Sequence, residues 1–138
     1  HMSEKVAGRL RKHSFEAQRF FIGFKTNNGW YSAKLYAPFI TDDGLNIYHL
    51  CLFFLRTNWQ GKGVYQVQVT ALDPRPAKQQ LELFLPNKSK RNSLCKAVDK
   101  INQRYGEFSV SPARLIHRST MPNVIAPAWN PFGHRQSI

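Results

Sequence analysis

Hydrophobic and polar residues alternate along three stretches of the chain, and this period of two predicts three β-strands. The runs 18–26 and 30–39 are rich in aromatic residues and flank Asn27-Asn28-Gly29. Because these three residues tolerate the positive φ of a tight turn, the two runs predict a β-hairpin. A third strand is predicted at 64–72. Each strand has one apolar face, made up of Phe20, Ile22, Phe24, Tyr31, Ala33, Leu35, Ala37, Tyr65, Val67, Val69 and Ala71.

Helical spacing predicts a short first helix at 3–13, with Ser3 as its N-cap. Val6 and Leu10 lie one turn apart and form its apolar face. Its basic residues are expected to point elsewhere: Lys5, Arg9 and Lys12.

A second helix is predicted at 41–59, where the spacing i, i+3, i+4 places several apolar residues in one stripe. Its capping groups are Thr41, Asp42 and Asp43. The stripe is widened by Leu45, Leu52 and Phe53, so this helix is expected to be buried on more than one side. The stripe itself consists of Ile47, Leu50, Cys51, Phe54 and Leu55.

A third helix is predicted to start at Asn92 or Ser93 and to stop at Gly106. Between the third strand and this helix, 87–92 reads "NKSKRN" and is interpreted as a linker. The run 108–116, "FSVSPARLI", predicts a short strand, and the last twenty residues are expected to be irregular. The apolar face of the third helix consists of Leu94, Val98, Ile101 and Tyr105.

The composition is that of a folded α+β protein: 42% of the 138 residues are apolar and 13% are aromatic. We interpret His1-Met2 as a cloning scar, 3–76 as the main domain, 77–91 as a linker and 92–138 as a C-terminal helix and tail. The two cysteines are expected to be buried thiols rather than a disulfide. No apolar run is long enough to span a membrane, and no signal-peptide pattern is present. We therefore expect a soluble, cytoplasmic protein without a membrane partner.

The strong positive charge points to a polyanionic partner, most commonly nucleic acid. Twenty Lys and Arg face eight Asp and Glu, a net charge of +12, and both halves of the chain are basic. The polar face of the three strands carries groups that neutralise phosphates or donate hydrogen bonds to them. A solvated sheet face with a merely soluble basic surface is the simpler alternative. The polar face consists of Arg19, Lys25, Ser32, Lys34, Tyr36, Gln66, Gln68 and Thr70.

No pattern in the sequence indicates catalysis, a metal site or a cofactor. The histidines are scattered, and no H-x-x-x-H or C-x-x-C spacing occurs. The adjacent carboxylates Asp42 and Asp43 open a helix, where capping explains them. Gly61-Lys62-Gly63 is too short for a phosphate-binding loop and is interpreted as a turn.

The five residues "QLELF", 80–84, have two interpretations. Prolines and charged residues flank them, and apolar and polar residues alternate only weakly within them. Both features favour a displayed peptide. In such a peptide the Leu-Phe pair fills an apolar pocket of a partner, while Gln80 supplies hydrogen bonds. The alternative is a buried strand, with Leu83 and Phe84 in the core and the tail in a subunit interface.

Three segments of the chain are similar to parts of UmuC-type (ImpB/MucB/SamB-like) Y-family DNA polymerases. "QLELF" resembles the peptide with which bacterial replication and repair proteins bind the sliding clamp. "FFIGFKTNNGWYSAKLY" and "LCKAVDKINQRYGEFSVSPARLI" resemble the C-terminal part of the family. The resemblance implies a little-finger domain, a βαββαβ unit with two helices behind a sheet that lies along DNA. Here the unit lacks its first strand.

The resemblance also implies the partners and the site residues. The partners are primer-template DNA, the bacterial sliding clamp and, through the tail, a UmuD-type subunit or a recombinase. Gln80, Leu81, Leu83 and Phe84 match the clamp motif. The catalytic palm is absent, so this chain is expected to be a non-catalytic part of a DNA-directed DNA polymerase. The candidate DNA contacts are Arg19, Lys25, Lys34 and Lys62, joined by Gln66 and Gln68 from the polar sheet face.

Two questions stay open at this point. A free-standing, basic RNA-binding α+β protein would have the same charge and aromatic strands; exposed rings that stack on single-stranded bases would favour it. Without the family's first strand, the sheet is expected to have an exposed edge. We hypothesise that 108–116 or a second copy of the chain fills this edge.

Overall fold

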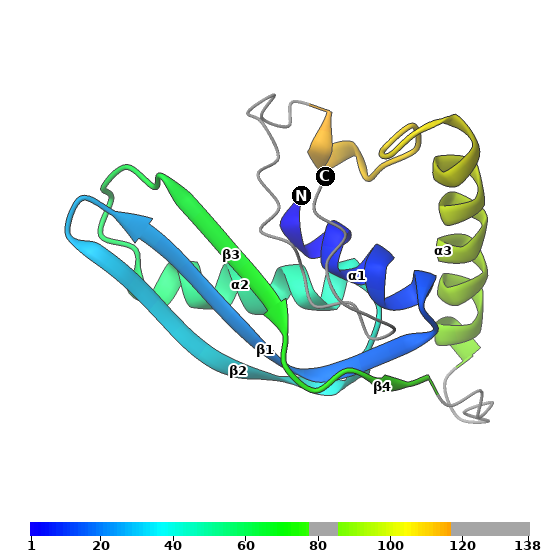
Figure 1. The fold of residues 1–138 in the computed structure, drawn as a ribbon, viewed down its shortest axis with the longest axis horizontal. Coiled ribbons are helices and arrows are strands. Elements are labelled where there is room, and N and C mark those ends of the chain that lie inside the picture. Colours follow the sequence, from blue (N-terminus) through cyan, green and yellow to red (C-terminus); the bar gives the residue numbers. More distant parts are fainter. Residues whose placement is uncertain (78–85, 117–138) are drawn as a thin grey trace, which may run out of the picture.

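The computed structural model describes residues 1–77 and 86–116, and its arrangement is α+β (Figure 1). Strand β1 lies in the centre of an antiparallel sheet with the order β2-β1-β3, and the short strand β4 pairs with the start of β1. The elements in chain order are α1 (Met2–Lys12), β1 (Phe15–Thr26), β2 (Gly29–Thr41), α2 (Gly44–Asn58), β3 (Gln66–Ala71), β4 (Arg75–Pro76), α3 (Pro86–Tyr105) and a 3-10 helix, η1 (Ala113–Leu115).

The predicted hairpin and its two-faced strands are confirmed. Gly29 closes the turn between β1 and β2 with a φ of +113°, which a glycine adopts without strain. Phe20, Ile22 and Phe24 are buried on one face of β1. On β3 only Val69 of the apolar positions is fully buried, whereas Val67 is 49% exposed. The apolar face of β3 is therefore covered only in part.

The core lies between that apolar sheet face and the helices α1 and α2. Ala7 and Leu10 of α1 and Ile47 and Phe54 of α2 form one buried cluster with Phe20 and its neighbours in the sheet. Figure 1 shows the two helices side by side against the sheet. The expectation of two helices behind a sheet is confirmed, and the opposite face of the sheet has no helix on it among the described residues.

Helix α1 begins one residue earlier than the sequence predicted, and Ser3 does not cap it. His1 is the N-cap and makes no side-chain cap hydrogen bond. Ser3 is buried because it shares the core-facing stripe with Ala7 and Leu10, at the spacing i, i+4, i+7. Lys5 points away from the core-facing stripe, as expected, yet it is only 6% exposed, and its Nζ lies 3.1 Å from the Glu107 carboxylate.

Helix α2 is capped as predicted but is buried on fewer sides than predicted. The Asp43 side chain accepts a hydrogen bond from the Leu45 amide at 2.9 Å, and Thr41 Oγ1 accepts one from the Asp43 amide at 3.0 Å. The predicted stripe faces the core. Leu45 and Phe53, however, are 37% and 62% exposed, so burial on a second side was a wrong prediction. Among the described elements, β2 and α1 lie closest to this helix, and the Phe24 ring of β1 packs on Phe54, with ring centroids 5.6 Å apart.

The third helix is longer than predicted and does not use its apolar face. It begins at Pro86, so the linker predicted at 87–92 is helical instead. A proline suits a first helical position, where its missing N–H would have no partner. Leu94, Ile101 and Tyr105 are 57%, 39% and 67% exposed, so their stripe contacts little among the described residues.

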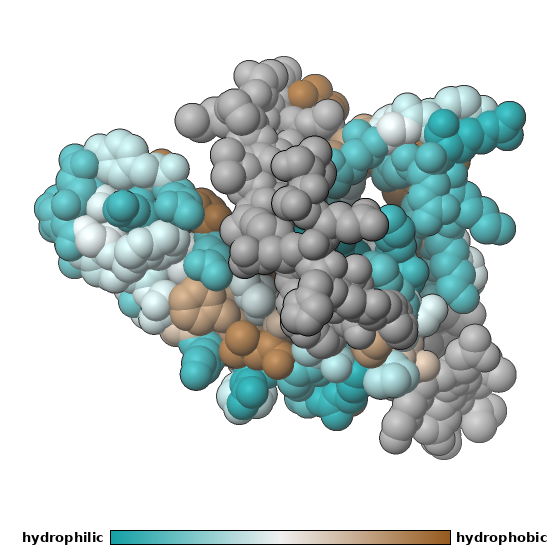
Figure 2. Space-filling view, viewed as in Figure 1, coloured by the Kyte–Doolittle hydropathy of each residue, from teal (hydrophilic) through white to brown (hydrophobic). Residues whose placement is uncertain are grey.

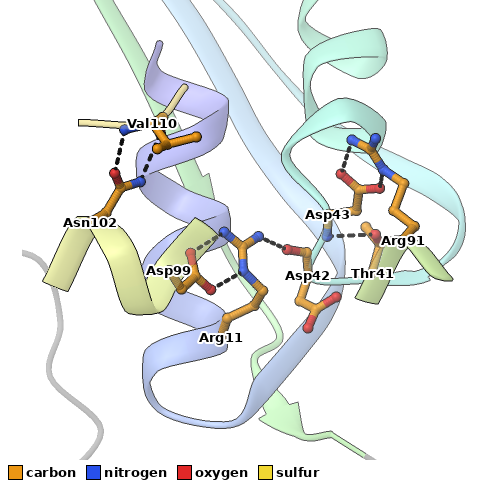
Figure 3. Close-up of polar contacts among 8 residues, drawn as sticks. All are labelled: Arg11, Thr41, Asp42, Asp43, Arg91, Asp99, Asn102 and Val110. Atoms are coloured by element: carbon orange, nitrogen blue, oxygen red, sulfur yellow. Dashed lines mark hydrogen bonds and ion pairs between the residues drawn. The ribbon is translucent and has the colours of Figure 1, made fainter. Parts of the chain in front are cut away.

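Polar side chains fasten α3 to the junction of α1 and α2 (Figure 3). The Arg11 guanidinium donates to both carboxylate oxygens of Asp99, at 2.6 and 2.9 Å, and to the backbone oxygen of Asp42 at 2.7 Å. Arg91 donates two hydrogen bonds to Asp43, one of them at 3.0 Å. The attachment of α3 is therefore mostly ionic.

The segment after α3 is not a strand. Residues 108–116 form turns and η1, and the Asn102 side chain both donates to and accepts from the backbone of Val110, at 2.9 and 2.8 Å (Figure 3). These side-chain bonds take the place of a strand partner. The segment consequently does not fill an edge of the sheet, and β2 and β3 are its two edges in the part of the chain described. Pairing with a second copy stays a prediction.

The cysteines are free thiols, as expected. Burial raises the pKa of the Cys51 thiol to about 11 and also raises the pKa of Cys95, which makes both poor nucleophiles. No helix in the described ranges is both long and apolar enough to cross a membrane.

Candidate nucleic-acid interface

The strand register arranges the polar face of the sheet as a grid of four rows. Paired residues lie opposite each other on the same face, so each row crosses neighbouring strands. In chain order along β1, the rows are Tyr36–Arg19, Lys34–Phe21–Thr70, Ser32–Gly23–Gln68 and Trp30–Lys25–Gln66. We call these eleven residues the open face. From Arg19 to Lys25 it extends over seven residues of β1, and the six steps between them span about 20 Å.

The open face brings together five of the six DNA contacts predicted from the sequence. Lys25, Lys34, Gln66 and Gln68 are exposed, and Arg19 is half-buried. Every charged member of the face is basic. In Figure 2, the surface over the strands is mainly hydrophilic, with a small hydrophobic patch near the end of β3. Such a surface can neutralise phosphates and hydrogen-bond to a polar backbone.

Lys62, the sixth predicted contact, lies elsewhere. It belongs to the loop between α2 and β3, where its backbone oxygen accepts a hydrogen bond from the Trp59 indole at 2.7 Å. With Phe24 and Tyr31 it lines a shallow hollow. Because these two rings stack on the helix-covered side of the sheet, Lys62 lies at the rim rather than on the open face.

A side-chain acceptor holds the backbone of β1 at Arg19. Asp73 lies between β3 and β4, which both pair with β1. Its Oδ1 accepts hydrogen bonds from the amides of Gln18, at 3.1 Å, and Arg19, at 2.7 Å. Arg19 Nε is buried and has no hydrogen-bond partner among the described atoms. Nothing in the sequence pattern marked Asp73, since its role depends on how two distant segments meet.

The open face also carries two aromatic rings that are not among the predicted DNA contacts. Trp30 is 46% exposed and Tyr36 is 65% exposed. Tyr36 was already placed on the polar face by strand alternation. The same alternation, with Tyr31 facing the core, is a signal that would have found Trp30, although it lies next to the turn.

In 1–77 and 86–116, no group of three or more His, Cys, Asp or Glu side chains is arranged to hold a metal ion. The predicted clamp motif, Gln80, Leu81, Leu83 and Phe84, lies outside the described residues.

A comparison with known protein families gives a match for this chain. The model of the impB/mucB/samB family C-terminal domain matches residues 1–83, more than half of the chain. This chain belongs to that family. The match is to the C-terminal little-finger domain of Y-family DNA polymerases, and it confirms the resemblance found in the sequence. Membership implies DNA as a partner of the domain. No curated protein and no solved structure matched the chain significantly.

Proposed function

We propose that this chain is the DNA-binding and sliding-clamp-tethering part of an error-prone translesion polymerase that acts in the bacterial DNA damage response. The observation that carries the proposal is the open face, a helix-free, basic and polar sheet surface in a member of a polymerase family. The chain itself is proposed to be non-catalytic, with nucleotide transfer carried out by the rest of the polymerase.

The open face binds DNA through its phosphates. Arg19, Lys25 and Lys34 neutralise backbone charge, and the Gln66 and Gln68 amides add hydrogen bonds that fix the register. Because phosphates look alike in every sequence, such contacts give grip without sequence preference. That property suits a polymerase that must hold any duplex behind a lesion.

Clamp tethering rests on the likeness of 80–84 to a clamp-binding peptide. A peptide on the same chain as the open face converts DNA binding into an intramolecular event once the clamp is held. The tail, 117–138, is proposed to contact a UmuD-type subunit or a recombinase. An RNA-binding role is less well supported, since the family is that of a DNA polymerase domain.

Salt dependence of duplex binding tests the DNA-binding proposal. Each phosphate contact contributes a slope of about −0.9 to log K against log salt, so the three open-face cations predict about −2.7, and about −3.6 if Lys62 also contacts DNA. Replacing Lys25 and Lys34 by glutamine should lower the magnitude of the slope by about 1.8. Fluorescence anisotropy with a short duplex measures both.

The matched control is Lys96→Gln with Lys100→Gln, which removes the same charge from two exposed positions on α3. This control should keep the slope of the parent. A flat salt response of the parent, or an equal effect of both double variants, would contradict DNA binding by the open face.

A further inference from the structure

Four exposed side chains follow one line along β2. Trp30, Ser32, Lys34 and Tyr36 are all on the open face, because alternate residues of a strand share a face. We call them the β2 line. It has a ring at each end and a hydroxyl and a cation between them. Its ends are six residues apart, about 20 Å.

The rings at its ends are both exposed. Trp30 is 46% exposed and Tyr36 is 65% exposed, and in the parts of the chain described neither stacks on another ring nor lies beneath a cation. Single exposed rings are ordinary on protein surfaces. What distinguishes these two is that each is paired across the sheet with a basic residue, Trp30 with Lys25 and Tyr36 with Arg19.

This combination is the one that binds unpaired nucleotides. Single-stranded nucleic acids are held by positive charge along the backbone and by aromatic rings on which bases stack, since every base has a flat face. Bases inside a duplex are already stacked on one another, so exposed rings add little to duplex binding. The two exposed rings therefore favour a ligand with unpaired bases, whereas the phosphate contacts alone would suit any nucleic acid.

We propose that the β2 line binds single-stranded DNA, such as unpaired template, when no duplex occupies the open face. Bases stack on Trp30 and Tyr36, and Lys25, Lys34 and Arg19 neutralise the phosphates between them. At a rise of about 3.4 Å per nucleotide, the line spans about six nucleotides. The inference deepens the proposed function and rests on it, because it assigns a second class of DNA to the same face.

The test compares single-stranded and duplex DNA on the full chain. Anisotropy would be measured with an oligothymidine of about 12 nucleotides and with a blunt duplex, for Trp30→Ala, Tyr36→Ala and the double variant. One stacked base contributes about 1–3 kcal/mol, so each alanine should weaken single-strand binding about fivefold to 150-fold. Duplex affinity should stay that of the parent. Trp30→Phe and Tyr36→Phe should keep most of the single-strand affinity, since they keep a ring.

The control is Tyr105→Ala on α3, which removes a tyrosine of matching exposure, 67%, away from the open face. Circular dichroism establishes that each variant is folded. The inference is overturned if the parent binds duplex alone, if the alanine variants bind single strands like the parent, or if they lose both ligands equally. The proposed function fails separately, if duplex binding is absent or insensitive to salt while single-strand binding still needs the rings.

Discussion

At the scale of single residues, Asp73 connects the geometry of the sheet with that of the open face. It is the acceptor for two amides of β1, those of Gln18 and Arg19, in the break between β3 and β4. A second oxygen accepts from Arg75 at 3.2 Å. Since Arg19 is the cation at this end of the open face, the acceptor at residue 73 determines both local stability and the position of a proposed DNA contact.

Asp73→Ala is expected to destabilise the fold by about 1–3 kcal/mol, because two partly buried amides lose their acceptor. Asp73→Asn keeps an acceptor oxygen at the same place and should cost clearly less. Urea unfolding of the parent and both variants measures the difference. Equal losses in the two variants would mean that the negative charge, rather than the acceptor oxygen, stabilises this part of β1.

The residues that sequence patterns described well are those whose environment depends on their own strand or helix. Alternation placed Lys25, Lys34 and Gln68 on one face, and the register confirmed it. The surroundings of Lys62 and Lys5 come from other elements, so no strand or helix pattern predicted them. A loop turns Lys62 to the rim, and the segment after α3 covers Lys5. No local pattern contains that information.

At the scale of elements, the attachment of α3 depends on charge and therefore on pH. Burial alone would raise the pKa of Asp43, but hydrogen bonds from Arg91 and from the Leu45 amide, with the charges of Arg91 and Arg11, outweigh it. The pKa of Asp43 is consequently below its usual value. Burial raises the pKa of the neighbouring Glu4 despite the attraction of Arg11. The two carboxyls therefore contribute to stability with opposite dependence on pH.

Asp43→Asn separates the ion pair from the helix cap. A carboxyl with a lowered pKa in the folded state adds stability above its unfolded pKa, about 4, and loses it as the pH falls through the folded value. Asparagine still caps α2, so the variant loses only the ion pair. At neutral pH its free energy of unfolding should fall by about 1 kcal/mol. This is a low value for charged hydrogen bonds, because Arg91 is 41% exposed. Urea unfolding from pH 7 to pH 3 should show this difference shrinking. A difference independent of pH would contradict the ion pair.

The elements that the sequence predicted correctly are those with a clear hydrophobic period. The hairpin, β3 and the stripe of α2 have a clear period and a buried face, so pattern and structure agree. The first turns of α3 are polar on all sides, and a polar run without a period was interpreted as a linker. The strand predicted at 108–116 failed because Asn102 supplies the hydrogen bonds that a neighbouring strand would have given.

At the scale of the whole molecule, two modest contacts on one chain would act as one strong one. The open face holds phosphates with few cations, and salt weakens such binding steeply. A clamp-bound peptide close to that face in the chain keeps DNA at a high effective concentration, on the millimolar scale for a short flexible connection. The chain would then bind primer-template DNA tightly where a clamp is loaded and weakly elsewhere.

Titration of the full chain with a purified bacterial sliding clamp tests this. Leu83→Ala with Phe84→Ala should weaken clamp binding at least about 30-fold, since residues that dominate an interface contribute about 2 kcal/mol or more. Its DNA affinity without the clamp should stay that of the parent. The matched control, Leu94→Ala with Tyr105→Ala, removes two exposed apolar side chains from α3 and should bind the clamp normally. If the Leu83 and Phe84 variant instead loses its cooperative unfolding, these side chains belong to the core. In that case the fold, and not a partner, accounts for "QLELF".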